Sequence, residues 1–228
     1  MTIGMVFLSF LMAIIVGWLF RQTVHVQPWR AQPAVPVLPT APAAKAGLWV
    51  FLAVASSLFV LVVSASSMRL GLADWSPIPR PRLLLLNTAL LAFASLSMES
   101  AARAGRRGDV GALRPWLVAG GVLTAGFVLG QLVVWKQLHD AAYGMSSSAA
   151  AAFFYLFTAA HGLHVLGGLV AWARAVSRAW KGAKPAALRL NVELCATYWH
   201  YLLGVWVVLY ALLVSGGAGL AICSSNPL

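Results

Sequence analysis

The stretch His161-Gly162-Leu163-His164-Val165 lies inside an apolar run that is long enough to cross a lipid bilayer. A second apolar run contains Glu193 and, a little further on, Tyr198-Trp199-His200. An ionisable side chain at membrane depth is costly, and it is tolerated mainly where it faces the interior of a helix bundle, a ligand or a partner. The fold and the function of this chain therefore depend on why these residues stand in these two runs.

The composition is that of a polytopic membrane protein. Hydrophobic residues make up 61% of the chain and charged residues 9%, with a mean hydropathy of +0.84, which excludes an ordinary soluble domain. The formal net charge of +11 would suggest nucleic-acid binding in a soluble chain. Here the basic residues stand in short gaps between apolar runs, so we expect them to set topology and contact lipid head groups, with no nucleic acid as a partner. The cysteines, Cys195 and Cys223, give no disulfide framework.

Six apolar runs have the length of a membrane-spanning helix, about 17 to 25 residues. They lie at residues 3–20, 47–68, 83–102, 116–138, 149–173 and 190–215. The first run is unlike a signal peptide, because no Lys or Arg precedes it and Arg21 follows it directly. The sequence therefore predicts an all-α polytopic membrane protein with six transmembrane helices.

A proline-rich segment separates the first apolar run from the other five. Its prolines are Pro28, Pro33, Pro36, Pro39 and Pro42, and this spacing prevents a continuous helix. A proline-rich ligand for a partner domain is an alternative interpretation of the same segment. We predict an N-terminal transmembrane helix at 1–22, a Pro-rich cytoplasmic linker at 23–46, a five-helix bundle at 47–215 and an extracytoplasmic tail at 216–228.

The basic residues predict the orientation of the helices. Twelve of the sixteen Lys and Arg residues fall in the first, third and fifth gaps between runs, and four fall on the other side. Because cytoplasmic loops carry an excess of Lys and Arg, we expect these three gaps in the cytoplasm and both termini outside.

Polar residues recur at helical spacing within the apolar runs. The candidate network consists of Asn87 in the third run, Gln131 in the fourth, His161 and His164 in the fifth, and Glu193, Thr197 and His200 in the sixth. Spacings of three, four or seven residues keep each set on one helix face. We expect these faces to meet inside the bundle as a buried hydrogen-bond network.

Two other interpretations of these residues remain open. His161, His164, His200 and Glu193 are suitable in type as ligands of a single metal ion, and chains of Glu and His carry protons in pumps. Five histidines in the whole chain are too few, at matching depth, for a dihaem site. We favour the structural interpretation, with no catalytic residue, cofactor or metal ion held by this chain.

The two histidine-containing runs resemble those of a known family, subunit III of the haem–copper respiratory oxidases. The fifth run is similar to the family's FF-x-x-TG-x-HG-x-HV-x-x-G helix through Thr158, His161, Gly162, His164, Val165 and Gly168. The sixth is similar to its E-x-x-x-x-YWHF-x-x-x-VW helix through Glu193, Tyr198, Trp199, His200, Tyr201, Val205 and Trp206. Weaker likenesses are Asn87 with Thr88, Phe127 with Gln131, and the stretch from Lys45 to Phe51. Together they cover residues 45–214.

The resemblance implies a non-catalytic subunit of a bacterial terminal oxidase that works in aerobic electron transport. Haem and copper would belong to its partners, oxidase subunits I and II, with cytochrome c or a larger respiratory supercomplex as further partners. It also implies bound phospholipid, a role in stabilising the catalytic subunit and in proton uptake, and a place in the bacterial inner membrane. Arg178 matches a family arginine that contacts a lipid phosphate.

This chain departs from the family pattern at two positions. A buried glutamate of the family falls at about Ala55, and an aspartate falls at about Leu203. By this resemblance the first apolar run would stand where the family's second helix stands, with the first helix missing, so we expect a short, six-span form. An accessory subunit of a quinol oxidase or of nitric oxide reductase is an alternative, as is an independent transporter or channel of another class.

Overall fold

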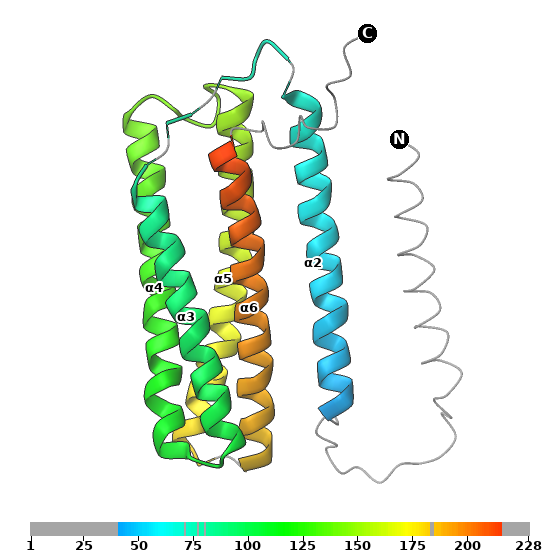
Figure 1. Ribbon diagram of the computed structural model, residues 1–228, viewed down its shortest axis with the longest axis vertical. Helices are drawn as coiled ribbons and strands as arrows, with labels where there is room; N and C mark the ends of the chain where they lie inside the picture. Colours follow the sequence, from blue (N-terminus) through cyan, green and yellow to red (C-terminus); the bar gives the residue numbers. More distant parts are fainter. Residues whose placement is uncertain (1–40, 71, 77, 80, 183–184, 216–228) are drawn as a thin grey trace, which may run out of the picture. The chain divides into compact units, whose positions relative to one another are not determined.

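The computed structural model describes residues 41–70, 72–76, 78–79, 81–182 and 185–215, in which it forms five helices (Figure 1). They are α2 (Ala41–Arg69), α3 (Leu83–Arg106), α4 (Val110–Asp140), α5 (Ala149–Trp180) and α6 (Pro185–Ser215). Each of the five is long and apolar enough to cross a membrane. The all-helical membrane fold is therefore confirmed for this part of the chain. The predicted N-terminal helix, most of the predicted linker and the predicted tail lie outside the described residues.

All five helices are longer than the apolar runs that predicted them. α2 begins at Ala41, so residues 41–46 of the predicted linker are helical, with Pro42 in the first turn, where a missing N–H breaks no helical bond. α4 begins at Val110 and not after Pro115, because the Asp109 side chain caps it by accepting a hydrogen bond from the Ala112 backbone N–H at 2.9 Å. An apolar run ends where polar and charged residues become frequent, whereas a helix continues into the head-group region.

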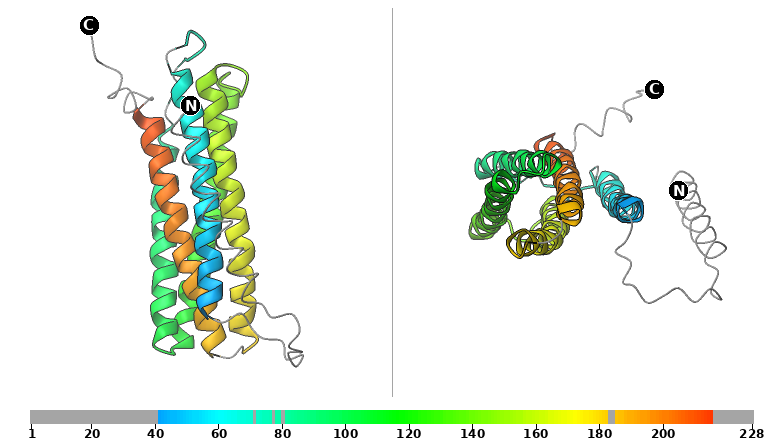
Figure 2. Two further views of the ribbon diagram at one scale, coloured as in Figure 1. Left: turned by 90° about the vertical axis from the view of Figure 1, so that its right-hand side faces the viewer. Right: turned by 90° about the horizontal axis from the view of Figure 1, so that it is seen from below.

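The helices α3 to α6 form a ring, and α2 stands outside it beside α6 (Figure 2). α2 packs mainly against α5 and α6, whereas α3 packs against α4 and α6. The up-and-down order brings most of the described basic residues to one end, the lower end in Figure 1. These are Lys45, Arg103, Arg106, Arg107, Arg114, Arg174, Arg178, Lys181 and Arg189. The side of the membrane on which this end lies remains a prediction.

Tryptophan–threonine hydrogen bonds join the helices of the ring at three places. The indole N–H groups donate to threonine hydroxyls from Trp199 to Thr124 at 2.8 Å, from Trp206 to Thr88 at 2.9 Å and from Trp135 to Thr158 at 3.0 Å. Each hydroxyl donates in turn to the backbone carbonyl four residues earlier in its own helix. A buried indole N–H needs an acceptor, and a threonine hydroxyl can accept and donate at once. These bonds tie α6 to α4, α6 to α3 and α4 to α5.

A glycine lets α4 and α5 approach closely. The indole N–H of Trp172 on α5 donates to the Leu117 carbonyl of α4 at 2.8 Å. A Cβ atom at Gly121 would overlap the ring of Trp172, so the indole lies directly on the bare α4 backbone. Packing of this kind replaces the hydrophobic effect, which does not act between helices in lipid.

The Gly121→Ala variant tests this contact. We expect it to lower the free energy of unfolding by about 1–3 kcal/mol, since the added methyl group must displace the Trp172 ring. The matched control is Gly162→Ala on α5, where an added Cβ has nothing within 4 Å. Equilibrium unfolding in mixed detergent micelles compares the two variants. Equal stabilities would show that Trp172 moves aside freely.

Candidate functional site

Asn87 and Gln131 meet in the core between α3 and α4. The side-chain N–H of Asn87 donates to the Gln131 carbonyl oxygen at 3.3 Å, and both residues are buried. Gly130 makes room for this pair, because a Cβ there would overlap the Asn87 amide oxygen. The pair therefore holds two helices together from within the core.

His161 lies fully buried in an aromatic environment. Its ring contacts Phe127 edge-on, with centroids 5.8 Å apart, and Trp206 in a tilted arrangement at 5.2 Å. Neither ring nitrogen has a hydrogen-bond partner within the described part of the chain. The imidazole is packed here as a member of the aromatic core.

His164, three residues further along α5, faces α2. Its ring centroid lies 5.3 Å from that of Phe59 and 6.2 Å from that of Phe51. Its Nδ1 lies 2.7 Å from the carbonyl oxygen of Ala160, and because a carbonyl only accepts, this nitrogen carries the proton. His164 therefore forms part of the surface on which α2 rests.

His200 belongs to a charged cluster at the basic end of the helices. Its Nδ1 lies 2.5 Å from the Ser95 hydroxyl, and its Nε2 lies 3.5 Å from a carboxylate oxygen of Glu99. Glu99 also accepts hydrogen bonds from Arg103 at 3.0 Å and Arg106 at 2.9 Å. The order Ser–His–Glu resembles a hydrolytic triad, but Ser95 is only 1% exposed, so no substrate could reach its hydroxyl.

Glu193 ties α2 to α6 in the same cluster. One carboxylate oxygen accepts a hydrogen bond from Arg189 at 2.9 Å, and the other lies 3.3 Å from the Lys45 ammonium of α2. The Thr197 hydroxyl donates to the Glu193 backbone carbonyl at 3.1 Å. Thr197 and Glu193 were expected in the network. The partner Lys45 was not, because the sequence shows it only as a basic residue at the start of a weakly family-like stretch.

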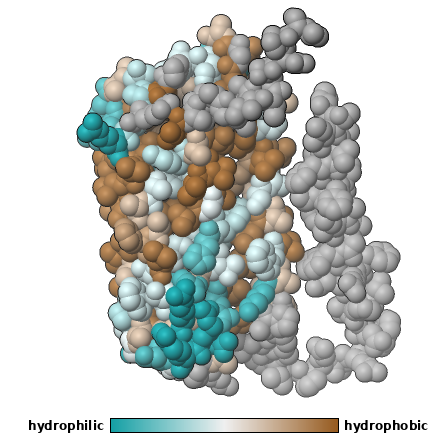
Figure 3. Space-filling view, viewed as in Figure 1, coloured by the Kyte–Doolittle hydropathy of each residue, from teal (hydrophilic) through white to brown (hydrophobic). Residues whose placement is uncertain are grey.

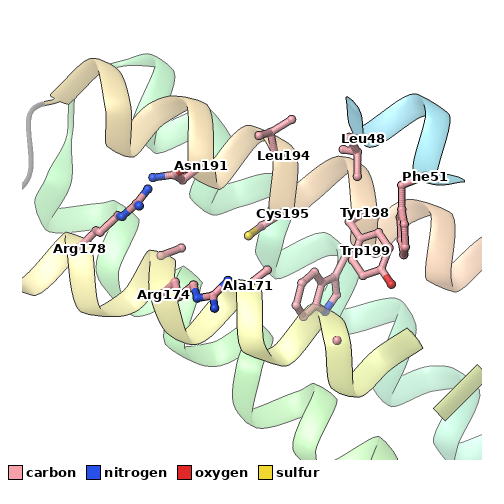
Figure 4. Close-up of a pocket in the computed structure, with 12 residues that line it drawn as sticks. Leu48, Phe51, Ala171, Arg174, Arg178, Asn191, Leu194, Cys195, Tyr198 and Trp199 are labelled. Atoms are coloured by element: carbon pink, nitrogen blue, oxygen red, sulfur yellow. The ribbon is translucent and has the colours of Figure 1, made fainter. Parts of the chain in front are cut away.

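Arg178 borders a cleft between α2, α5 and α6 with a volume of about 490 Å³. Figure 4 shows Arg178 pointing from α5 toward Asn191 of α6, with Arg174 one turn away. Leu48, Phe51, Leu194, Cys195, Tyr198 and Trp199 supply most of the wall. The Asn191 side-chain N–H₂ has no hydrogen-bond partner among the described residues. The cleft is thus apolar along most of its length and rich in hydrogen-bond donors at one end.

The predicted residues therefore lie in five places. Asn87 and Gln131 are paired in the core, His161 is enclosed by aromatic rings, and His164 faces α2. Glu193, Thr197 and His200 join the charged cluster, whereas Arg178 lies apart from it at the cleft. Among the residues that the structure describes, no three His, Cys, Asp or Glu side chains converge as metal ligands.

A bundle of long apolar helices, with His161 and His164 in packing positions and a cleft beside α2, defines a multi-pass membrane protein. The sequence profile of the family described as Cytochrome c oxidase subunit III matches residues 45–217. The chain belongs to this family, as its motifs indicated, and it is subunit III of a haem–copper oxidase.

Three relatives illustrate the similarity. The chain is 31% identical over 161 residues to the probable cytochrome c oxidase subunit 3 of Mycobacterium tuberculosis (strain ATCC 25618 / H37Rv), which covers 69% of this chain and 78% of the relative. It is 33% identical over 141 residues to the probable cytochrome c oxidase subunit 3 of Nocardia farcinica, covering 60% and 70%. It is 29% identical over 175 residues to cytochrome c oxidase subunit 3 of a Synechocystis species, covering 73% and 72%.

A double-mutant cycle on Asn87 and Gln131 tests their structural role. We expect Asn87→Leu or Gln131→Met alone to cost about 1–3 kcal/mol of stability, because each leaves a buried amide without its partner. The double variant should cost less than the sum, by about 0.6–1.7 kcal/mol. Equilibrium unfolding in detergent measures the stability of the two single variants and of the double variant. If the two single losses of stability simply add up in the double variant, the two side chains do not interact directly.

Proposed function

We propose that this chain contributes no redox centre to its oxidase and acts by holding phospholipid at the side of its helix bundle, thereby stabilising the catalytic subunit. The observation that carries this proposal is the cleft between α2, α5 and α6. Its volume of about 490 Å³ lies within the usual range for ligand sites.

The residues of the cleft match the two parts of a phospholipid. Arg174 and Arg178 supply guanidinium groups that bind phosphate oxygens well, and Asn191 supplies an unpaired N–H₂ group. Phe51, Leu194 and the rest of the apolar wall suit an acyl chain. The donors lie at the end of the helices, where head groups lie, and the apolar wall continues toward the middle of the bundle.

The partners of this chain would be oxidase subunits I and II, which would hold the haem and copper and take electrons from cytochrome c. We place the complex in the bacterial inner membrane, with the basic end of the helices in the cytoplasm and both termini outside. The charged cluster around Glu99 and Glu193 would then face the side from which protons are taken up, which supports a role in proton uptake. The predicted N-terminal helix, linker and tail belong to this proposal.

Purification through an affinity tag on this chain tests the proposal. We expect a-type haem and copper to copurify, with oxygen consumption driven by reduced cytochrome c. Quinol as the only effective donor, or nitric oxide as the only substrate, would favour the alternative complexes. A functional chain without haem-containing partners would contradict the proposal.

The Arg174→Gln/Arg178→Gln variant tests the lipid cleft. We expect the purified complex to retain at least one phospholipid fewer, because the phosphate loses both guanidinium partners. Native mass spectrometry of the complex counts the lipids. The control is Arg107→Gln, which removes an exposed charge at the same end of the bundle, directly after the last residue of α3. Unchanged lipid retention in the double variant would rule out the cleft as the site.

A further inference from the structure

We infer that a second phospholipid site, selective for an anionic head group, lies on the opposite side of α2, in a hollow between α2, α3 and α6. This hollow has a volume of about 480 Å³. It shares Leu48 and Leu194 with the cleft of Arg178, so the two hollows flank the same contact of α2 with α6. The inference does not depend on lipid binding in the Arg178 cleft, since the charged residues of the two hollows are different.

Three helices build the hollow. α2 and α3 both pack against α6, so α6 forms the floor and the other two form the walls. The charged and polar lining consists of Lys45 from α2, Glu99 and Arg106 from α3, and Arg189, Glu193, Thr197 and His200 from α6. Figure 3 shows hydrophilic side chains gathered at the lower end of the bundle, the end at which the charged residues of the hollow lie.

The charges of the cluster leave an excess of hydrogen-bond donors. Glu99 pairs with Arg103 and Arg106, and Glu193 pairs with Lys45 and Arg189, so four cations share two carboxylates. Each carboxylate therefore already has two cationic partners. A guanidinium group has five N–H donors and an ammonium group has three, so most donors of the cluster are unused by these ion pairs. A ligand that fits must supply acceptor oxygens and negative charge, as a phosphate group does.

The carboxylates also argue against a zwitterionic head group. The ammonium group of such a lipid needs an acceptor, and Glu99 and Glu193 are engaged, with side chains only 24% and 17% exposed. The cations are more open, with Lys45 at 52% and Arg189 at 53%. The hollow thus presents positive charge outward and keeps its negative charge covered.

The surroundings of the charged cluster fit an acyl chain. Leu48, Trp49, Ala102 and Ala196 also line the hollow. One turn toward the middle of the bundle, Leu96 on α3 is 59% exposed, and Gly204 on α6 has open space where a Cβ would stand. The apolar surface begins beside the cluster of cations, at the end of the membrane-spanning helices. An anionic phospholipid can contact both the cations and the apolar surface, whereas a soluble anion can contact only the cations, so this arrangement favours the lipid.

The test compares two pairs of variants in the purified oxidase complex. In Lys45→Gln/Arg106→Gln, each carboxylate keeps one cationic partner, so the bundle retains its ion pairs at Arg103 and Arg189. In Glu99→Gln/Glu193→Gln, the cations lose their internal partners and become more available. The delipidated complex is titrated with phosphatidylglycerol and, separately, with phosphatidylcholine, and native mass spectrometry measures the bound lipid.

We expect opposite effects from the two pairs. Each lost cation should weaken phosphatidylglycerol binding about fivefold, so the first pair should weaken it about thirtyfold. The second pair should bind phosphatidylglycerol at least as tightly as the unmodified complex, and neither pair should change phosphatidylcholine binding. A merely structural role would instead weaken binding of both lipids in both pairs. The Arg174→Gln/Arg178→Gln variant should still bind phosphatidylglycerol at this second site. A negative result for the second site can therefore be told apart from a negative result for the Arg178 cleft.

Three results would overturn the inference. They are unchanged phosphatidylglycerol binding in Lys45→Gln/Arg106→Gln, equal binding of the two lipids by the unmodified complex, and cross-linking of Trp49 or Lys45 to another oxidase subunit in place of lipid. The last result would assign the hollow to a protein interface.

Discussion

The bundle depends on the need of each buried indole N–H group for an acceptor where water is absent. Threonine meets this need on three helices, because its hydroxyl accepts from the indole and passes a hydrogen bond on to its own helix backbone. Trp199 and Trp206 are fully buried and lie two turns apart on α6, so they fix the height and rotation of that helix against α4 and α3. The aromatic environment of His161 follows, because Trp206 forms one of its walls.

Much of the fold could be predicted from the sequence, since hydropathy alone locates five helices that the structure describes. The ends of the helices could not be predicted from hydropathy, because a helix can continue past the end of an apolar run. Arg103 ends the apolar run at 83–102, but α3 continues to Arg106, because a charged side chain at the membrane surface is compatible with a helical backbone. The fourth apolar run begins at residue 116, but α4 begins at Val110, where Asp109 caps it, and Pro115 lies inside the helix.

The candidate site was less predictable. Helix periodicity placed polar residues on common faces, but it cannot say which face meets which neighbour. His161 and His164 differ by only about 60° around α5, yet one lies in the core and the other against α2. Glu193 was recognisable as an unusual residue, whereas its partner Lys45 was hidden among the basic residues that set topology. Thr88 and Thr158 stood out in the sequence as parts of family-like motifs, but their role as acceptors for indole N–H groups could not be predicted, because the sequence does not show which helices meet.

The sparse packing of α2 gives the bilayer itself a way to act on this subunit. Its 29 residues extend about 43 Å, well beyond a hydrocarbon core of about 30 Å, so the helix must tilt or project from the membrane. Among the described residues α2 has fewer helix contacts than the four helices of the ring, so we expect it to adjust its tilt to membrane thickness more readily. Because α2 forms a wall of both hollows, we expect their widths to change with the thickness of the surrounding lipid.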